Sequence, residues 1–344
     1  MSDQSQVLYR KYRPQSFSQV FGQDHIVKVL KGSLELKKIG HAYLFSGPRG
    51  TGKTTMARLF AKELNCSETD IIEIDAASNR GIDDIRQLRE GVHSLPFSSE
   101  YKMYIIDEVH MLTKEAFNAL LKTLEEPPSH VIFVLATTEL HKVLPTVISR
   151  CQSFVFKSPT QTILKEMIQG IVDKEGSTID SGSLDLIALL GNGSFRDTQG
   201  VLQKLMSYSK DKHITREETE MVTGAPSVSL ITDMLDAVSK KDSAEVLNVL
   251  HATEEQNIDP YIFIQMLVQS IRHILFIRFS PQQKAHLKQQ LEEELFETYE
   301  VLASQKNTIN SGLLTALLHS YQNMHVSFSK YFALELALIE FLQD

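Results

Sequence analysis

The most informative segment of the sequence is Gly47-Pro48-Arg49-Gly50-Thr51-Gly52-Lys53-Thr54. An apolar run at 42–45 precedes it and a helical pattern at 54–64 follows, which is the strand–turn–helix order of a phosphate-binding loop. Glycines in such a loop let backbone N–H groups converge on an anion at the helix N-terminus. Lys53 is placed to reach the β- and γ-phosphates and Thr54 to ligate Mg²⁺, with Thr55 beside them. A plain glycine-rich turn would not require these flanks, so we expect the loop to bind a nucleoside triphosphate.

Short apolar runs alternate with helical patterns between residues 42 and 156, and another helical pattern at 26–34 leads into the first run. This alternation predicts a parallel α/β sheet that is covered on both faces and binds its ligands at the carboxyl ends of the strands. The expected strands are 42–45, 71–74, 103–106, 131–136 and 154–156, and the expected helices between them are 54–64, 82–92 and 114–124.

Polar residues follow two of these strands. Asp107 and Glu108 end the third, where an acidic residue can hold Mg²⁺ through water and its neighbour can orient or deprotonate the attacking water. A strand that simply ends in solvated acids is the alternative, and the phosphate loop in the same sheet argues against it. Thr137 and Thr138 end the fourth strand, where a hydroxyl can sense a γ-phosphate or position a water.

Two arginines lie beyond the sheet. Arg150 follows the fourth strand and a short helical segment, so we expect it to serve a neighbouring subunit's site rather than its own. Ser194 is a predicted N-cap for a helix whose first turn carries Arg196, which could touch the phosphates when a lid closes. Local capping or pairing is the alternative for Arg150, and a surface salt bridge is the alternative for Arg196.

The rest of the chain is expected to be helical. We predict an ATPase domain at 1–158, a lid of helices alone at 159–223, a linker at 224–227 and an oligomerisation domain at 224–344. Strong apolar faces beyond residue 228 suit a bundle that packs against copies or relatives of itself, although they could equally form a private core.

Composition limits the possible functions. A formal net charge of -8 means that nucleic-acid contact needs a local basic patch or several subunits. Cys66 and Cys151 make neither a disulfide framework nor a four-ligand zinc site. The polar N-terminus lacks an apolar signal core, and polar residues interrupt the apolar segment at 261–279, which indicates a buried helix. We therefore expect a cytoplasmic protein.

Together the motifs resemble the AAA+ ATPases of the clamp-loader group, and most closely the γ/τ family of bacterial DNA polymerase III. The matching stretches are dense from residue 8 to about 200. They are YRKYRP at 9–14, VFGQ at 20–23, HAYLF at 41–45, the loop at 47–54, EIDAASN at 73–79, DDIR at 83–86, YIIDEVHML at 104–112, FNALLKTLEEPP at 117–128, LATT at 135–138, SRC at 149–151 and GSFRD at 193–197. The resemblance implies an ATP- and Mg²⁺-dependent subunit of a heteropentamer that opens a sliding clamp and places it on primed DNA.

The resemblance also implies residue roles. It assigns ATP hydrolysis to Lys53, Thr54, Asp107 and Glu108, sensing to Thr138 and Arg196, and the finger in trans to Arg150; backbone contacts with DNA would come from Arg80, Arg86 and Lys122. The basic-aromatic opening at 8–14 could contact nucleic acid. We instead expect it to pack against the nucleotide base, with Arg13 and Gly22 in the nucleotide site.

One departure from the family pattern stands out. Family members usually carry a four-cysteine zinc module after the loop helix, whereas here Cys66 is followed directly by Ser67-Glu68-Thr69-Asp70 and the second strand. A lone thiol cannot close a tetrahedral site, so we expect no zinc.

Two alternatives to an ATP-hydrolysing clamp-loader subunit are a structural subunit that donates Arg150 without turnover and another AAA+ DNA remodeller. The intact phosphate loop argues against the first. The segments at 149–151 and 120–128 argue against the second.

Overall fold

The structure is a computed structural model that describes residues 6–305, 308–327 and 329–343. The chain forms two compact units, Met1–Ile214 and Thr215–Asp344, and each is described by itself. The first unit contains the predicted ATPase domain and most of the predicted lid, while helix α10 (Arg216–Thr223) lies at the start of the second. The division into three domains therefore stays a prediction.

A five-stranded parallel sheet with strand order β2-β3-β4-β1-β5 forms the centre of the first unit. All five predicted strands are confirmed. Their bounds are β1 Ala42–Ser46, β2 Ile71–Asp75, β3 Lys102–Asp107, β4 Val131–Thr137 and β5 Gln152–Val155.

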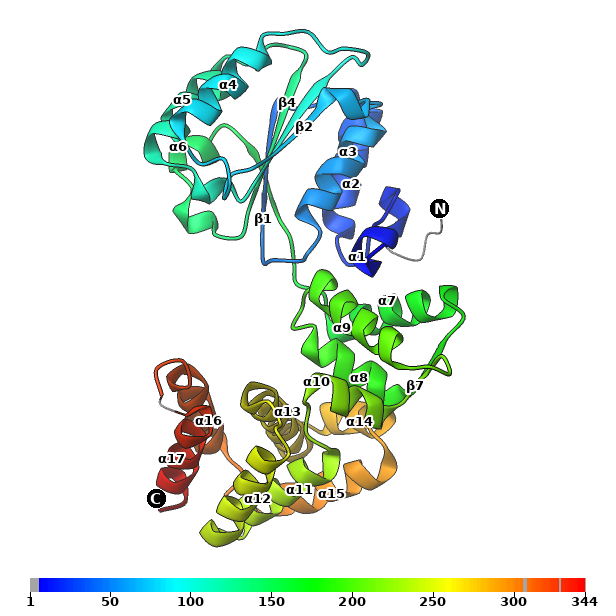
Figure 1. The fold of residues 1–344 in the computed structure, drawn as a ribbon, viewed down its shortest axis with the longest axis vertical. Helices are drawn as coiled ribbons and strands as arrows, with labels where there is room; N and C mark the ends of the chain where they lie inside the picture. Colours follow the sequence, from blue (N-terminus) through cyan, green and yellow to red (C-terminus); the bar gives the residue numbers. More distant parts are fainter. Residues whose placement is uncertain (1–5, 306–307, 328, 344) are drawn as a thin grey trace. The chain divides into compact units, whose positions relative to one another are not determined.

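Helices cover both faces of this sheet (Figure 1). Alternating residues of β1 show why: Ala42 and Leu44 face one hydrophobic core, and Tyr43 and Phe45 face the other. The first core is closed by α4 and α5, and the second by α2 and α3. Their bounds are α2 Asp24–Glu35, α3 Lys53–Glu63, α4 Ile82–Val92 and α5 Lys114–Glu125, with the short helix α6 at Pro145–Ile148. The predicted doubly covered α/β sheet is thus confirmed.

Three helices after the sheet form the lid, with bounds α7 Gln161–Lys174, α8 Ser181–Leu190 and α9 Phe195–Tyr208. The expectation of helices alone in this segment was wrong in one respect. Strands β6 (Thr178–Ile179) and β7 (His213–Ile214) pair in parallel. They are held by backbone bonds at their ends, and two residues are too few to show the alternation by which a strand is recognised in a sequence. The predicted cap at Ser194 is confirmed, because its hydroxyl accepts from the backbone N–H of Asp197.

Eight helices make up the described part of the second unit. After α10 they are α11 Val228–Ser239, α12 Ser243–Glu255, α13 Pro260–Phe279, α14 Pro281–Gln290, α15 Glu293–Ser304, α16 Ser311–Asn323 and α17 Lys330–Gln343. The predicted linker at 224–227 is a tight turn: Gly224 ends α10 in the left-handed conformation and the Ser227 hydroxyl caps α11.

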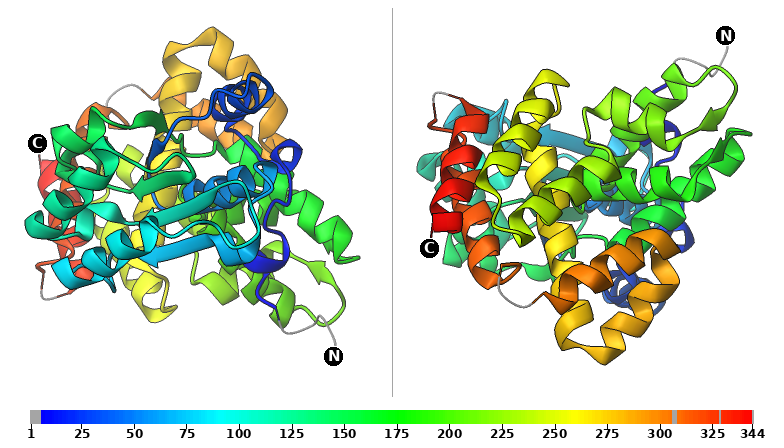
Figure 2. Two further views of the ribbon diagram at one scale, coloured as in Figure 1. Left: turned by 90° about the horizontal axis from the view of Figure 1, so that it is seen from above. Right: turned by 90° about the horizontal axis from the view of Figure 1, so that it is seen from below.

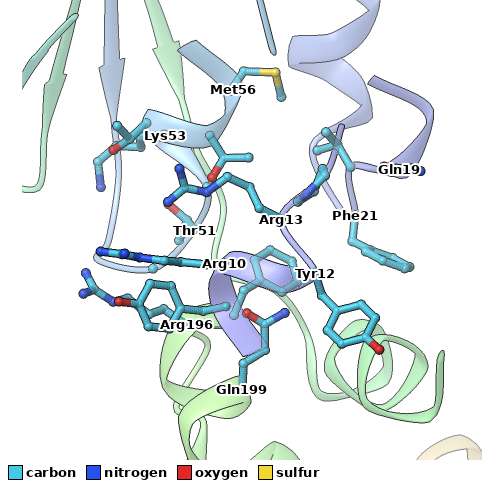
Figure 3. A pocket seen from close by; sticks show the side chains of 18 of the residues that line it. Arg10, Tyr12, Arg13, Gln19, Phe21, Thr51, Lys53, Met56, Arg196 and Gln199 are labelled. Atoms are coloured by element: carbon cyan, nitrogen blue, oxygen red, sulfur yellow. The ribbon is translucent and has the colours of Figure 1, made fainter. Parts of the chain in front are cut away.

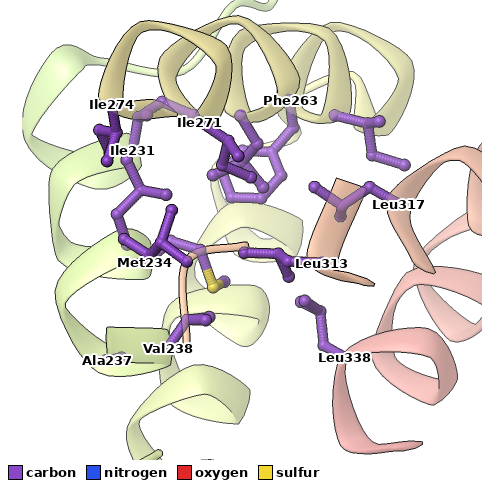
Figure 4. Close-up of a cluster of buried hydrophobic side chains, with 14 of the residues drawn as sticks. Ile231, Met234, Ala237, Val238, Phe263, Ile271, Ile274, Leu313, Leu317 and Leu338 are labelled. Atoms are coloured by element: carbon purple, nitrogen blue, oxygen red, sulfur yellow. The ribbon is translucent and has the colours of Figure 1, made fainter. Parts of the chain in front are cut away.

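Helix α13 supplies much of this unit's hydrophobic core. Figure 4 shows its Phe263, Ile271 and Ile274 in one cluster with side chains of α11 and α16, and Leu338 of α17 lies below Leu313 in the same cluster. The length and composition of α13 would also suit a membrane span, but its buried face packs into this core, as its interrupting polar residues led us to expect. Helices α16 and α17 lie side by side (Figure 2).

A half-buried arginine binds the end of α15. The guanidinium of Arg278, on α13, donates to four backbone carbonyls: Ala303 (2.8 Å), Ile309 (2.6 Å), Leu302 (3.2 Å) and Gln305 (2.8 Å). Carbonyls at a helix C-terminus have no partner within the helix, so the cation satisfies groups that would otherwise be left unpaired. Burial lowers the pKa of Arg278.

Candidate nucleotide-binding site

The phosphate loop connects β1 to α3 and depends on its glycines. Gly47, Gly50 and Gly52 have φ of 147°, 73° and 97°, where other residues are strained. A Cβ at Gly47 would also lie 2.5 Å from the carbonyl oxygen of Phe156. The loop therefore tolerates only glycine at this position, as expected where the backbone must turn tightly around an anion.

Lys53, the first residue of α3, points back over the loop. Its ammonium donates to the carbonyl oxygens of Gly47 (2.8 Å) and Pro48 (2.9 Å), and 6% of the residue is exposed. Burial lowers the pKa of Lys53, partly opposed by the charges of Glu108 and Asp107. The ammonium thus lies over the loop, where phosphate oxygens could replace the two carbonyls as acceptors.

The two predicted metal ligands lie together. The hydroxyl of Thr54 donates to the carboxylate of Asp107, the last residue of β3, at 2.7 Å. A hydroxyl and a carboxylate are the hard oxygen donors that Mg²⁺ takes beside a phosphate loop. The donor set therefore fits the metal that the loop implies.

Glu108 is held beside this pair. It adopts an uncommon left-handed conformation with φ of 48°, and its carboxylate accepts from the backbone N–H (3.2 Å) and the hydroxyl (2.9 Å) of Thr138. The structure thus joins the predicted water-activating residue to the predicted first sensor, although the two are 30 positions apart.

His110 joins the same network and was not singled out from the sequence. Its side chain is 6% exposed, with Nδ1 3.0 Å from the Thr137 hydroxyl and 3.5 Å from the Glu108 carboxylate. Its Nε2 lies 3.0 Å from the carboxylate of Glu139. The one available signal was its place two residues after Glu108, and only the short 3-10 turn Val109–Met111 brings it back toward β4.

A cavity of about 780 Å³ opens between the loop, the N-terminal segment and the lid (Figure 3). Figure 3 shows Lys53 and Thr51 on the loop side and Arg196 and Gln199 on the lid side. Eight cations line the cavity: Arg10, Lys11, Arg13, Arg49, Lys53, Arg58, Lys174 and Arg196. Burial, and then the neighbouring Arg58, lowers the pKa of Arg13. So dense a positive lining suits a polyphosphate.

The lid touches the loop directly. The backbone N–H of Phe195 donates to the carbonyl of Gly50 at 3.0 Å, and a Cβ on Gly50 would overlap the Ser194 hydroxyl. The N-terminus of α9, which is positive, is therefore fixed at the phosphate loop.

The remaining predicted site residues divide into two groups. Gly22 lies between Phe21 and Gln23, both of which line the cavity. Thr138 and Arg150 lie outside the cavity lining. Arg150 pairs with Glu125 at 2.5 Å and donates to the carbonyl of Thr146 at 2.7 Å.

The three cations predicted to contact DNA lie on or next to helices α4 and α5. Arg80 is exposed just before α4, Arg86 is exposed on α4, where it pairs with Asp83, and Lys122 is exposed on α5. Because α4 packs against α5, the three cations lie on one part of the first unit.

Asp70 lies in the segment between α3 and β2, where family members usually carry the zinc module, and its side chain binds the neighbouring loop. Its buried carboxylate accepts from the backbone N–H groups of Phe97 (2.5 Å), Ser98 (3.0 Å) and Ser99 (3.0 Å) and from the Ser67 hydroxyl (2.9 Å). Burial alone would raise the pKa of Asp70, but these hydrogen bonds outweigh it and hold the pKa well below its usual value.

Cys66 lies next to this region. Burial raises the pKa of its thiol to about 11, and the part of the chain that the structure describes holds no group of three His, Cys, Asp or Glu residues able to bind a metal. The absence of zinc stays a prediction.

The phosphate loop after β1, the acidic pair after β3 and the helical lid are the elements of a domain with the AAA+ fold. The RuvB Holliday junction branch migration motor of Thermotoga maritima shares this fold, with a TM-score of 0.53 and 22% identity over 66% of this chain and 79% of that one. A family model described as DNA polymerase III, delta subunit, matches residues 22–81 and 69–160. A second, for domain III of DNA polymerase III subunits gamma and tau, matches 214–343.

Curated relatives narrow the class. The chain is 43% identical to DNA polymerase III subunit tau of Bacillus subtilis, over 85% of this chain and 55% of that protein. It is 36% identical to DNA polymerase III subunit gamma of Buchnera aphidicola, over 80% of this chain and 82% of that protein. The chain belongs to the γ/τ family of DNA polymerase III subunits. It spans about half the length of several of the curated relatives it matches.

Proposed function

We propose that this protein is an ATP-hydrolysing subunit of a bacterial clamp loader, which places a sliding clamp on primed DNA during replication. The observation that carries the proposal is the joining of Thr54 to Asp107 and of Glu108 to Thr138 beside an intact phosphate loop, in a chain of the γ/τ family. Degraded loops are what a purely structural subunit would tolerate, and this loop keeps every residue that phosphate binding uses.

Binding of ATP would begin at the loop. Backbone N–H groups of residues Arg49 to Thr55 would surround the phosphates, and the Lys53 ammonium would exchange its two carbonyl acceptors for β- and γ-phosphate oxygens. Arg13 and the backbone around Gly22 would lie at the nucleotide, on the side lined by the N-terminal segment. Mg²⁺, held by Thr54 and Asp107, would neutralise charge that develops on the phosphates.

Hydrolysis would depend on Glu108. Its carboxylate would accept a hydrogen bond or the proton from the attacking water. Thr138 and His110 would orient the Glu108 carboxylate for this step. Arg196, on the lid, would contact the phosphates of the same subunit. Arg150 lies outside its own cavity lining, which supports a role as the arginine finger of an adjacent subunit.

The partners follow from the family. We propose a heteropentamer with other clamp-loader subunits, a sliding clamp, and backbone contacts to primed DNA through Arg80, Arg86 and Lys122. A few cations per subunit, repeated around a ring, would give an acidic chain an electrostatic footprint for DNA. Bacterial replication occurs in the cytoplasm, which is the location we propose.

A comparison of two variants tests the assignment. Lys53→Ala should abolish ATP binding, whereas Glu108→Gln should bind ATP and fail to hydrolyse it, because it keeps the shape of the side chain and loses its basicity. The measurements are ATP affinity and ATPase rate in the assembled complex. Full turnover by Glu108→Gln would point to a structural subunit whose measured activity comes from its partners.

A further inference from the structure

The N-terminal segment before the ATPase core is attached to the lid. Helix α1 (Leu8–Lys11) packs on α9, and the backbone N–H of Leu8 donates to the side chain of Gln203 at 3.0 Å. Lys11 and the hydroxyl of Tyr12 both bind the carboxylate of Glu175, at the end of α7, at 2.7 and 2.6 Å. Each of these contacts ties the segment to the lid.

The same segment is also attached to the core. The ammonium of Lys62, on α3, donates to the carbonyl of Gln15 at 3.0 Å. Residues 9 to 15 line the cavity along the way. The segment therefore runs from the lid to the helix that carries the phosphate loop, along the wall of the proposed nucleotide site.

Tyr9 occupies a particular place in this segment. The guanidinium carbon of Arg196 lies 4.9 Å from the centre of its ring, and that of Arg10 lies 5.9 Å away. A cation at such a distance from an aromatic face is attracted by the negative face of the ring. The half-buried ring of Tyr9 thus contacts two of the cations that line the cavity.

An aromatic partner would stabilise the position of the Arg196 side chain. Arg196 is exposed, and it lies in the first turn of α9, where the helix dipole disfavours a positive charge. Across residues 6–305, 308–327 and 329–343, no carboxylate pairs with its guanidinium. A long side chain without an ion pair loses much rotational freedom when it binds a phosphate, and a partner that already restricts it reduces that loss.

We propose that Tyr9 is a positioning residue for Arg196: its ring holds the guanidinium on the lid side of the cavity, ready to contact the phosphates. The inference rests on the proposed ATPase function and adds a residue that acts through Arg196 rather than on the nucleotide. The aromatic face does this, not the hydroxyl. Tyr9→Phe should therefore preserve the effect and an aliphatic side chain should remove it.

The test is a double-mutant cycle on the full chain in its complex, with Tyr9→Leu, Arg196→Ala and the pair. Tyr9→Leu should weaken ATP binding or lower kcat about fivefold, the equivalent of about 1 kcal/mol for one cation–π contact. Tyr9→Phe should match the unaltered protein. In the Arg196→Ala background, Tyr9→Leu should have no further effect, because the group it positions is gone.

Control variants distinguish the loss of Arg196 positioning from a loss of folded structure. Tyr208→Leu, at the far end of α9, should leave both quantities unchanged. Thermal unfolding checks that each variant is folded, and Tyr9→Met replaces Tyr9→Leu if the latter does not fold. An equal loss from Tyr9→Leu with and without Arg196, or no loss at all, would overturn the inference. If the unaltered protein binds ATP without hydrolysing it, the proposed function fails, and coupling in ATP affinity alone still decides the role of Tyr9.

Discussion

The site geometry predicts that replacing Thr138 by valine lowers the rate of ATP hydrolysis. Valine has the shape of threonine, so it removes the hydroxyl bond to the Glu108 carboxylate at 2.9 Å and keeps the backbone bond at 3.2 Å. A hydrogen bond to a charged group contributes about 1.5–3 kcal/mol, which corresponds to about 10- to 150-fold in rate. Because the backbone bond remains, we expect kcat to fall by about tenfold, the lower end of that range.

The assay is ATP turnover by the assembled complex, together with equilibrium binding of ATP. Thr138 lies outside the cavity lining, so ATP affinity should stay within about twofold of the unaltered protein. Thr138→Ser is the matched control, since it keeps the hydroxyl and should keep the rate. An unchanged kcat in Thr138→Val, or a loss of ATP binding in place of a loss of rate, would show that the Thr138 hydroxyl does not act through Glu108.

Three further predictions concern the finger, the Asp70 site and the second unit. Arg150→Ala should leave ATP binding nearly intact and lower turnover in the complex by about 10³-fold; a collapse of binding to the isolated subunit would contradict a role in trans. Asp70→Asn should lower Tm by about 4 °C at neutral pH, because an amide replaces a carboxylate that accepts three backbone N–H groups. Since the folded-state pKa of Asp70 is depressed, its stabilisation is fully present above the unfolded pKa of about 4 and is lost as pH falls through the folded value, so the two proteins should converge in Tm below about pH 4. A gap that persists in acid would show that the charge is not the cause. Arg278→Ala should destabilise the second unit by about 3 kcal/mol in denaturant unfolding, with Arg278→Lys in between, because an ammonium lacks the planar fork that reaches four carbonyls; equal stability of all three proteins would show that these bonds contribute nothing.

The parts of the site that are contiguous in sequence could be predicted. The phosphate loop needs its glycines, Lys53 and Thr54 at fixed spacing, and strand ends such as Asp107 lie at one edge of any parallel sheet. The same local signals located all five strands and the cap at Ser194.

The parts that depend on long-range packing could not be predicted. Arg10 lines the cavity because α1 packs on α9 of the lid, and this placement leaves no local pattern in the sequence. The Asp70 site joins residues 67–70 to 97–99, which become neighbours only when β2 and β3 pair. Strands β6 and β7 are likewise defined by their pairing and not by composition.

The second unit shows a different limit. Its apolar stripes predicted helices and a core, and α13 supplies that core as expected. The four carbonyls around Arg278 come from the end of α15 and the segment after it, so their spacing from residue 278 carried no signal in advance.

In the proposed function, hydrolysis of ATP held between neighbouring subunits drives the loading of a clamp on DNA. The most direct test is the ATPase rate of the full complex with and without the sliding clamp and primed DNA, with Glu108→Gln run in parallel. We expect the rate to rise when both are added and to be lost in Glu108→Gln. A rate that is the same with and without clamp and primed DNA would contradict it.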